Sequence, residues 1–119
     1  ALLADRLQLE VVLRNLLANA LEAAAERPPA ERRVRVSARQ DDAGRVCITV
    51  EDSGAGITEQ MEEHLFEAFH TSKASGLGLG LAISRAIAEA HGGTLAAEVA
   101  DHGLFRLTLP IEEAVTDAA

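Results

Sequence analysis

The chain has 119 residues, of which 48% are hydrophobic, so it fits a single domain with a sizeable core. Its formal net charge of −8 argues against binding to a phosphate backbone, and its 3% of aromatic residues offers few platforms for stacking bases. We therefore expect no nucleic-acid partner.

A single cysteine, Cys47, excludes an intramolecular disulfide and favours a reducing compartment. No apolar run is long enough to cross a membrane, and no signal peptide is visible. The chain starts directly in a predicted helix, so we expect it to be a fragment of a longer protein. The expected location is cytoplasmic, without direct membrane contact by this domain, although the parent protein can be membrane-anchored.

Hydrophobic periodicity predicts helix, hairpin, short helix, loop, helix and hairpin, in that order. The predicted elements are a helix over 5–26, strands over 34–39 and 45–51, a short helix over 58–66, a helix from about 77 to 90, and strands over 94–100 and 104–110. Thr58 is the expected N-cap of the short helix, with Met61, Leu65 and Phe66 turned inward.

Because hairpins pair antiparallel, this order predicts the α+β class: a two-layer α/β sandwich whose mostly antiparallel sheet carries helices on one face. Residues 1–111 are expected to form the domain, and 112–119 a frayed C-terminal tail.

Two asparagines in the first predicted helix, Asn15 and Asn19, are four residues apart and therefore share one face. Asn inside a helix costs roughly half a kcal/mol against Ala, so two among leucines suggest a purpose. An amide oxygen held on a helix can coordinate Mg²⁺. Two asparagines on a half-exposed face are the structural alternative.

The second predicted strand ends in Asp52-Ser-Gly-Ala-Gly56. By itself this is a turn sequence. The functional alternative is that Asp52 accepts a hydrogen bond from the adenine amino group and repels the keto oxygen of guanine. Gly54 and Gly56 would then let the backbone pass close to a flat ring.

Glycines alternate with leucines immediately before the last predicted helix. These residues are Gly76, Leu77, Gly78, Leu79, Gly80 and Leu81. Unshielded backbone N–H groups at a helix start, with Lys73 nearby, suit phosphate, although flexible loops also use glycine.

In this order, the motifs resemble those of sensor histidine kinases over nearly the whole chain. The matching segments are Asn15-Leu-Leu-Ala-Asn19-Ala-Leu-Glu-Ala23 to the N box, Asp52-Ser-Gly-Ala-Gly56 to the first glycine box, Phe66-Glu-Ala-Phe69-His-Thr-Ser-Lys73 to the F box, and Gly76-Leu-Gly-Leu-Gly-Leu81 to the second glycine box. The resemblance implies the catalytic, ATP-binding domain of a two-component histidine kinase, with the GHKL (Bergerat-type) fold.

The resemblance also implies a role for each matching residue, with ATP and Mg²⁺ as cofactors. It makes Asn19 the Mg²⁺ ligand, with Asn15 beside the phosphates, and Lys73 a second catalytic residue near the terminal phosphate. It assigns the adenine amino group to Asp52, and the base is lined by Gly54, Gly56 and Ile57. The remaining expected nucleotide-binding residues are Ala23, Thr71, Ser72, Gly76, Leu77, Gly78, Leu79, Gly80 and Leu81, of which residues 71–79 would form a lid over ATP.

By the same resemblance, the γ-phosphate goes to a histidine on a separate dimerisation domain that is missing from this sequence, and a response regulator acts downstream. None of the four histidines, His64, His70, His91 and His102, lies in an acceptor motif. We therefore expect no autophosphorylation by this chain alone.

Two departures from the family pattern bear on the site. Glu22 stands where many relatives carry a basic residue, which puts a phosphate-neutralising role at this position in doubt. Leu104 is nearest to the position where a Thr is usual, so we expect no bridging hydroxyl beside Asp52.

Three other classes share some of these motifs. ATP-hydrolysing clamps of the gyrase and mismatch-repair type carry a water-activating Glu where this chain has Asn15. A serine kinase that regulates a sigma factor is similar in size and motifs. A degenerate binding module without nucleotide chemistry is the non-enzymatic alternative.

Overall fold

The computed structural model describes residues 3–41, 43–67 and 80–110. The whole predicted lid, 71–79, and the whole predicted tail, 112–119, lie outside these ranges. The predicted limits of the domain therefore stay a prediction.

The described α-helices and strands follow the predicted order, and a short 3-10 helix that was not predicted lies between the first helix and the first strand. The described elements are α1 (Leu3–Ala24), the short 3-10 helix η1 (Pro29–Glu31), β1 (Val34–Gln40), β2 (Arg45–Asp52), α2 (Glu59–His64), α3 (Gly80–Ala90), β3 (Thr94–Ala97) and β4 (Gly103–Pro110). Any helical residues before Gly80 lie outside the described part of the chain.

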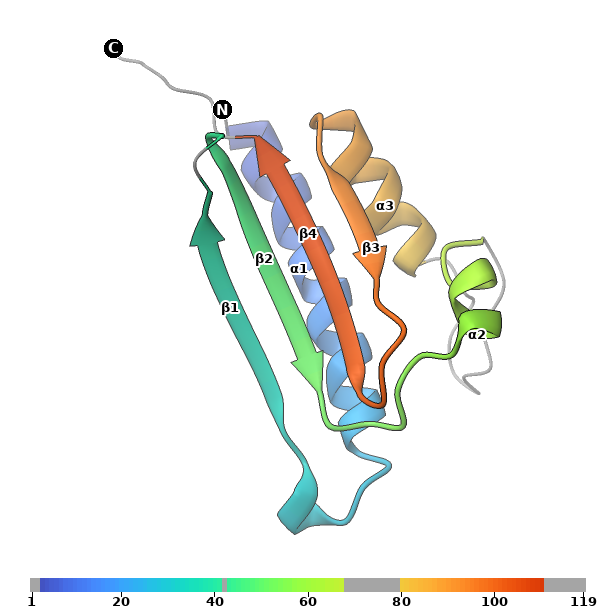
Figure 1. The fold of residues 1–119 in the computed structure, drawn as a ribbon. Helices are drawn as coiled ribbons and strands as arrows, with labels where there is room; N and C mark the ends of the chain where they lie inside the picture. The colour runs from blue at the N-terminus through green and yellow to red at the C-terminus, as the bar shows by residue number, and fades with distance from the viewer. Residues whose placement is uncertain (1–2, 42, 68–79, 111–119) are drawn as a thin grey trace.

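The four described strands form one antiparallel sheet in the order β1-β2-β4-β3, so the two hairpins join through β2 and β4. Figure 1 shows α1 and α3 side by side on one face of this sheet. The predicted two-layer sandwich is confirmed.

Strand alternation sends every second side chain of the sheet toward the helices. Val50 of β2, Phe105 and Leu107 of β4, and Leu95 of β3 are buried there. They meet the apolar face of α1, where Val12, Leu16 and Ala20 are at most 1% exposed. This single core fixes the sheet against both long helices.

The long helix α1 ends at Ala24, four residues before Pro28 and Pro29, whose rings cannot continue a helix. None of the described helices has both the length and the apolar character needed to span a bilayer.

The short helix α2 is capped as predicted, because the Thr58 hydroxyl accepts a hydrogen bond from the Met61 N–H at 3.1 Å. The expectation that Met61 points inward is wrong, since this residue is 44% exposed. Leu65 and Phe66 do pack against the core. Both follow the end of the six-residue helix, so the chain turns them inward after α2 rather than along one helical face.

The predicted strand 94–100 is shorter in the structure, because β3 ends at Ala97. Ala100 instead forms an isolated bridge to Ile57, with N–H to carbonyl distances of 3.0 and 3.1 Å. The segment after β2 is thereby held against the turn that leads into β4.

Candidate functional site

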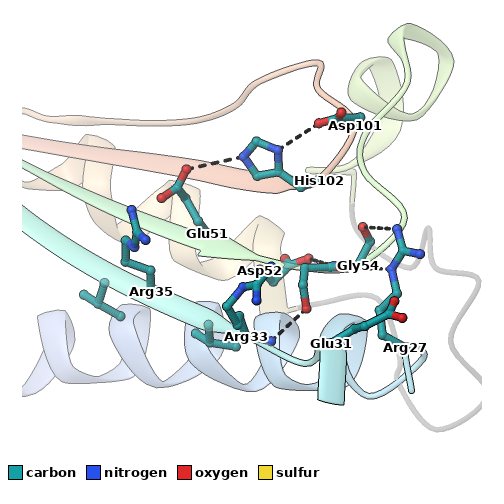
Figure 2. Close-up of a pocket in the computed structure, with 12 residues that line it drawn as sticks. Arg27, Glu31, Arg33, Arg35, Glu51, Asp52, Gly54, Asp101 and His102 are labelled. Carbon is teal, nitrogen blue, oxygen red and sulfur yellow. Dashed lines mark hydrogen bonds and ion pairs between the residues drawn. The ribbon is translucent and has the colours of Figure 1, made fainter. Parts of the chain in front are cut away.

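The carboxylate of Asp52 is held in one orientation at the end of β2. Asp52 follows Val50 by two residues, so it lies on the helix-covered face of the sheet, where it is 5% exposed. Its Oδ1 atom accepts a hydrogen bond from the Gly54 N–H at 2.8 Å (Figure 2). A buried carboxylate in a fixed turn can recognise one specific donor.

Two glycines and the end of α1 enclose this carboxylate. A Cβ atom on Gly54 would lie 2.8 Å from Asp52 Oδ1 and 2.9 Å from the Cβ of Ala23, and one on Gly103 would overlap Asp52 Oδ2. The fold thus brings together three of the residues predicted to bind the nucleotide: Ala23, Asp52 and Gly54.

The residue directly opposite Asp52 is Gly103, whereas Leu104 pairs with Glu51. Leu104, which the sequence places nearest to the usual Thr position, is thus one residue away from the strand partner of Asp52. Since strand alternation turns Leu104 with Glu51 to the opposite face, the neighbour of Asp52 on β4 has no side chain at all.

Gly56 lies directly against the backbone of Ala100 and Asp101, in the turn before β4. Its φ of +100° lies in the region that favours glycine, and a Cβ there would overlap the carbonyl oxygen of Ala100. Ile57, which follows it, is 5% exposed and belongs to the hydrophobic core. A core role accounts for Ile57 whether or not it also lines a base.

The asparagine end of the candidate site lies where α1 meets the start of α3. The side-chain Nδ2 of Asn15 donates to the Gly80 carbonyl at 3.3 Å and to the Ser84 hydroxyl at 3.2 Å. Asn19 is one turn further along the same face, half-buried. From Asn15 to Ala23 the helix rises about 12 Å, so α1 connects the asparagine end of the site with the Asp52 end.

Several predicted site residues cannot be placed. Thr71, Ser72, Lys73, Gly76, Leu77, Gly78 and Leu79 lie outside the described residues. Gly80 begins α3, and Leu81 is half-buried against the core.

Among residues 3–41, 43–67 and 80–110, no group of three His, Cys, Asp or Glu side chains could hold a metal ion. Mg²⁺ requires oxygen ligands in octahedral geometry and usually takes several of them from water and substrate phosphates. An amide oxygen on α1 therefore fits this metal only as one ligand beside a bound phosphate.

Arg27 is a site residue that the sequence reading missed, because it looked only like part of the stop after the first helix. Its Nε donates to the carbonyl of Ser53 at 2.7 Å, and its Nη2 to the carbonyl of Gly54 at 3.4 Å. The Ser53 hydroxyl also accepts from the Arg33 N–H at 2.8 Å. The turn beside Asp52 is thus anchored to the residues that follow α1, a contact for which the sequence holds no local signal.

An open hollow of about 940 Å³ adjoins this turn at the edge of the sheet (Figure 2). Its lining is Arg27, Glu31, Arg33, Val34, Arg35, Val36, Glu51, Asp52, Ser53, Gly54, Asp101 and His102. It shares only Asp52 and Gly54 with the predicted site and contains neither asparagine of α1. Its charges are mixed, so the lining selects for neither an anion nor a cation.

His102 joins the turn before β4 to β2. Its Nδ1 lies 3.0 Å from Asp101 Oδ1 and its Nε2 lies 3.3 Å from Glu51 Oε2 (Figure 2). The hydrogen bond with Asp101, and then that with Glu51, raises the pKa of His102 above its ordinary value of 6.5, while partial burial opposes them. Protonated His102 can donate to both carboxylates at once.

Replacing His102 by Gln should lower stability more at acidic than at basic pH. A pKa that is raised on folding contributes stability that is complete below 6.5 and is lost as the pH rises through the folded-state pKa. Urea unfolding of both proteins at pH 6 and pH 8.5 measures this, and we expect the difference in unfolding free energy to shrink at pH 8.5. An equal difference at both pH values would contradict the ion-pair assignment.

Nearly the whole chain is similar in sequence to known proteins. Residues 4–113 match the family model described as "Histidine kinase-, DNA gyrase B-, and HSP90-like ATPase". Sensor protein FixL of Bradyrhizobium diazoefficiens is 44% identical over 110 residues, which are 91% of this chain and 21% of that protein. The C4-dicarboxylate transport sensor protein DctB of Rhizobium meliloti is 46% identical over 101 residues, covering 85% of this chain and 16% of that protein. The chain thus spans about a fifth of the length of these curated relatives.

Solved structures agree with this. The mycobacterial sensor histidine kinase MprB has a TM-score of 0.78 at 32% identity, over 87% of this chain and 72% of that one. The catalytic domain of histidine kinase ThkA has a TM-score of 0.75 at 33% identity, over 89% and 68%. Full-length ShkA in complex with AMPPNP has a TM-score of 0.75 at 30% identity, over 92% of this chain and 22% of that one.

Proposed function

Because the chain belongs to the family of histidine kinase-, DNA gyrase B- and HSP90-like ATPases, among the ATP-binding catalytic domains of sensor histidine kinases, we propose that it binds Mg²⁺·ATP between α1 and the Asp52 turn. Residues 1–111 are the proposed domain and 112–119 the tail. The proposed location is the cytoplasm, and the proposed partners are the acceptor-histidine domain of the same kinase and a response regulator downstream.

The observation that carries this proposal is the carboxylate of Asp52. It is 5% exposed, and its Oδ1 is engaged by the Gly54 N–H. A buried carboxylate with remaining lone pairs can accept from the exocyclic amine of adenine. The keto oxygen of guanine at the same place would face another acceptor, which costs affinity and gives selectivity.

The phosphates are proposed to lie toward the start of α3. Asn19 offers an amide oxygen for Mg²⁺, and the first turn of α3 has N–H groups without an acceptor within the helix. Lys73, with Thr71, Ser72, Gly76, Leu77, Gly78 and Leu79, is proposed to close over the phosphates. Bound Mg²⁺ would neutralise charge on the phosphate oxygens.

The reaction is proposed to be transfer of the γ-phosphoryl group to a histidine on the separate acceptor domain. The P–O bond to ADP breaks, and a P–N bond forms to the imidazole nitrogen of that histidine. The contribution of this chain is to position ATP in line and to hold the base and phosphates away from water. Asn19 and Lys73 are the proposed catalytic residues.

Calorimetric titration of the chain with AMPPNP, with and without Mg²⁺, tests the binding step. We expect binding that strengthens with Mg²⁺, and about tenfold weaker binding by Asn19→Ala only when Mg²⁺ is present. Gln8→Ala removes an exposed amide from the same helix and should leave the affinity unchanged. Absence of binding by the unaltered chain would refute the proposal, and an equal loss with and without Mg²⁺ would refute the role of Asn19.

Two chemical assays separate the proposed reaction from related ones. Multiple-turnover phosphate release should stay near background, because Asn15 stands where the clamp ATPases carry their water-activating Glu. Incubation with the parent kinase's acceptor domain should give acid-labile phosphohistidine. Sustained phosphate release, or acid-stable phosphoserine on a protein substrate, would favour the clamp or the sigma-factor kinase instead.

A further inference from the structure

The side chain of Asn15 forms two hydrogen bonds from α1 to α3. Its two acceptors lie in the first five residues of α3: the Gly80 carbonyl at 3.3 Å and the Ser84 hydroxyl at 3.2 Å. Ser84 is completely buried, although its neighbours on that helix face are apolar. A buried hydroxyl among apolar side chains needs a partner, and Asn15 supplies it.

The orientation of the Asn15 amide follows from its acceptors. The Gly80 carbonyl can only accept, so the nitrogen and not the oxygen of the amide must face it. The two hydrogens of Nδ2 are then engaged by Gly80 and Ser84. What remains is Oδ1, an acceptor, which cannot donate to a phosphate oxygen.

The backbone at Gly80 lies close to the Asn15 side chain. A Cβ atom on Gly80 would lie 3.8 Å from the Cγ of Asn15, an ordinary van der Waals distance. The first residue of α3 therefore lies directly against the Asn15 amide. Asn19, the proposed metal ligand, is one turn away on the same face of α1.

We propose that Asn15 is a positioning residue that acts through Ser84 and the Gly80 carbonyl, and that it sets the start of α3 relative to Asn19. This inference rests on the proposed function, because the groups it aligns are the metal ligand and the phosphate-binding end of α3. In the bound state these two groups must meet the same phosphates. A shift of α3 along α1 would move the phosphate-binding end of α3 away from Asn19.

Ser84→Ala is the decisive variant, since Ser84 is buried inside the helix pair and is not a proposed ligand contact. We expect Ser84→Ala and Asn15→Ala each to weaken Mg²⁺·AMPPNP binding by roughly tenfold. The double variant should bind no more weakly than Asn15→Ala, because Asn15→Ala already removes the hydrogen bond to Ser84. Gln8→Ala serves again as the control for an amide lost from an exposed position on α1.

Hydrogen exchange of the nucleotide-free chain provides a second measurement that needs no ligand. Both single variants should exchange faster at the amides of Ser84, Arg85 and Ala86 than the unaltered chain, with no change in β1. If the unaltered chain does not bind nucleotide, the proposed function is refuted. The exchange pattern of the variants still decides the role of Asn15 in that case. Full nucleotide affinity in Ser84→Ala, losses that add in the double variant, or unchanged exchange in α3 would overturn the inference.

Discussion

Replacing Asp52 by Asn is expected to lower the affinity for AMPPNP by 10- to 100-fold, on the order of 1.5–3 kcal/mol for a hydrogen bond to a charged group. Asn keeps an oxygen for the Gly54 N–H, which Asp52 Oδ1 accepts at 2.8 Å, so the turn should survive. The second carboxylate oxygen becomes an amide NH₂ group, and a donor then faces the amino group of adenine. Competition between AMPPNP and GMPPNP measures the change, and the preference for adenine should shrink with the affinity.

Glu51→Gln is the matched control for Asp52→Asn. Glu51 precedes Asp52 on β2, carries the same charge and lies on the opposite face, where it pairs with His102. Glu51→Gln should leave the affinity for AMPPNP within about twofold, because surface charges that do not touch the ligand contribute little. Equal losses in both variants would show a general effect of charge, and an unchanged affinity in Asp52→Asn would remove the adenine contact from the proposal.

Gly56→Ala is expected to destabilise the fold by about 3–5 kcal/mol, a large part of the stability of a domain of this size. Two costs combine at this position. The φ of +100° is unfavourable for alanine, and the new methyl group would overlap the Ala100 carbonyl and come within 2.7 Å of the carbonyl carbon of Asp101. Relief requires breaking the bridge between Ile57 and Ala100. Urea denaturation followed by circular dichroism measures the loss.

Gly44→Ala separates these two costs. Gly44 has a φ of +79° in the turn between β1 and β2, but a Cβ there meets nothing within 4 Å. Gly44→Ala should therefore lower the free energy of unfolding only by the cost of a positive φ for alanine, about 1–2 kcal/mol. If Gly56→Ala lowers the free energy of unfolding no more than Gly44→Ala does, the backbone at Ala100 and Asp101 can move away from residue 56 at little cost.

Local sequence patterns were sufficient for the order of the α-helices and strands and for the type of sheet. Hydrophobic periodicity predicted the helix over 5–26, in which Val12, Leu16 and Ala20 form the buried face, and period-two alternation predicted both hairpins. The prediction for Met61 failed because α2 is too short for periodicity to define a buried face. The end of β3 was predicted wrongly because Ala100 pairs with Ile57, which is distant in sequence, and not with β4.

Within the candidate site, the sequence by itself identified the residue types and their order along the chain: asparagines on one helix face, and a carboxylate after a strand. Only the tertiary structure decided which groups these residues meet. Strand register placed Gly103 rather than Leu104 opposite Asp52, and the packing of α1 on α3 joined Asn15 to Ser84. Helix and strand periods act over a few residues, so sequence can reveal them. Contacts between residues 51 or 69 positions apart depend on how the layers pack, which no local pattern encodes.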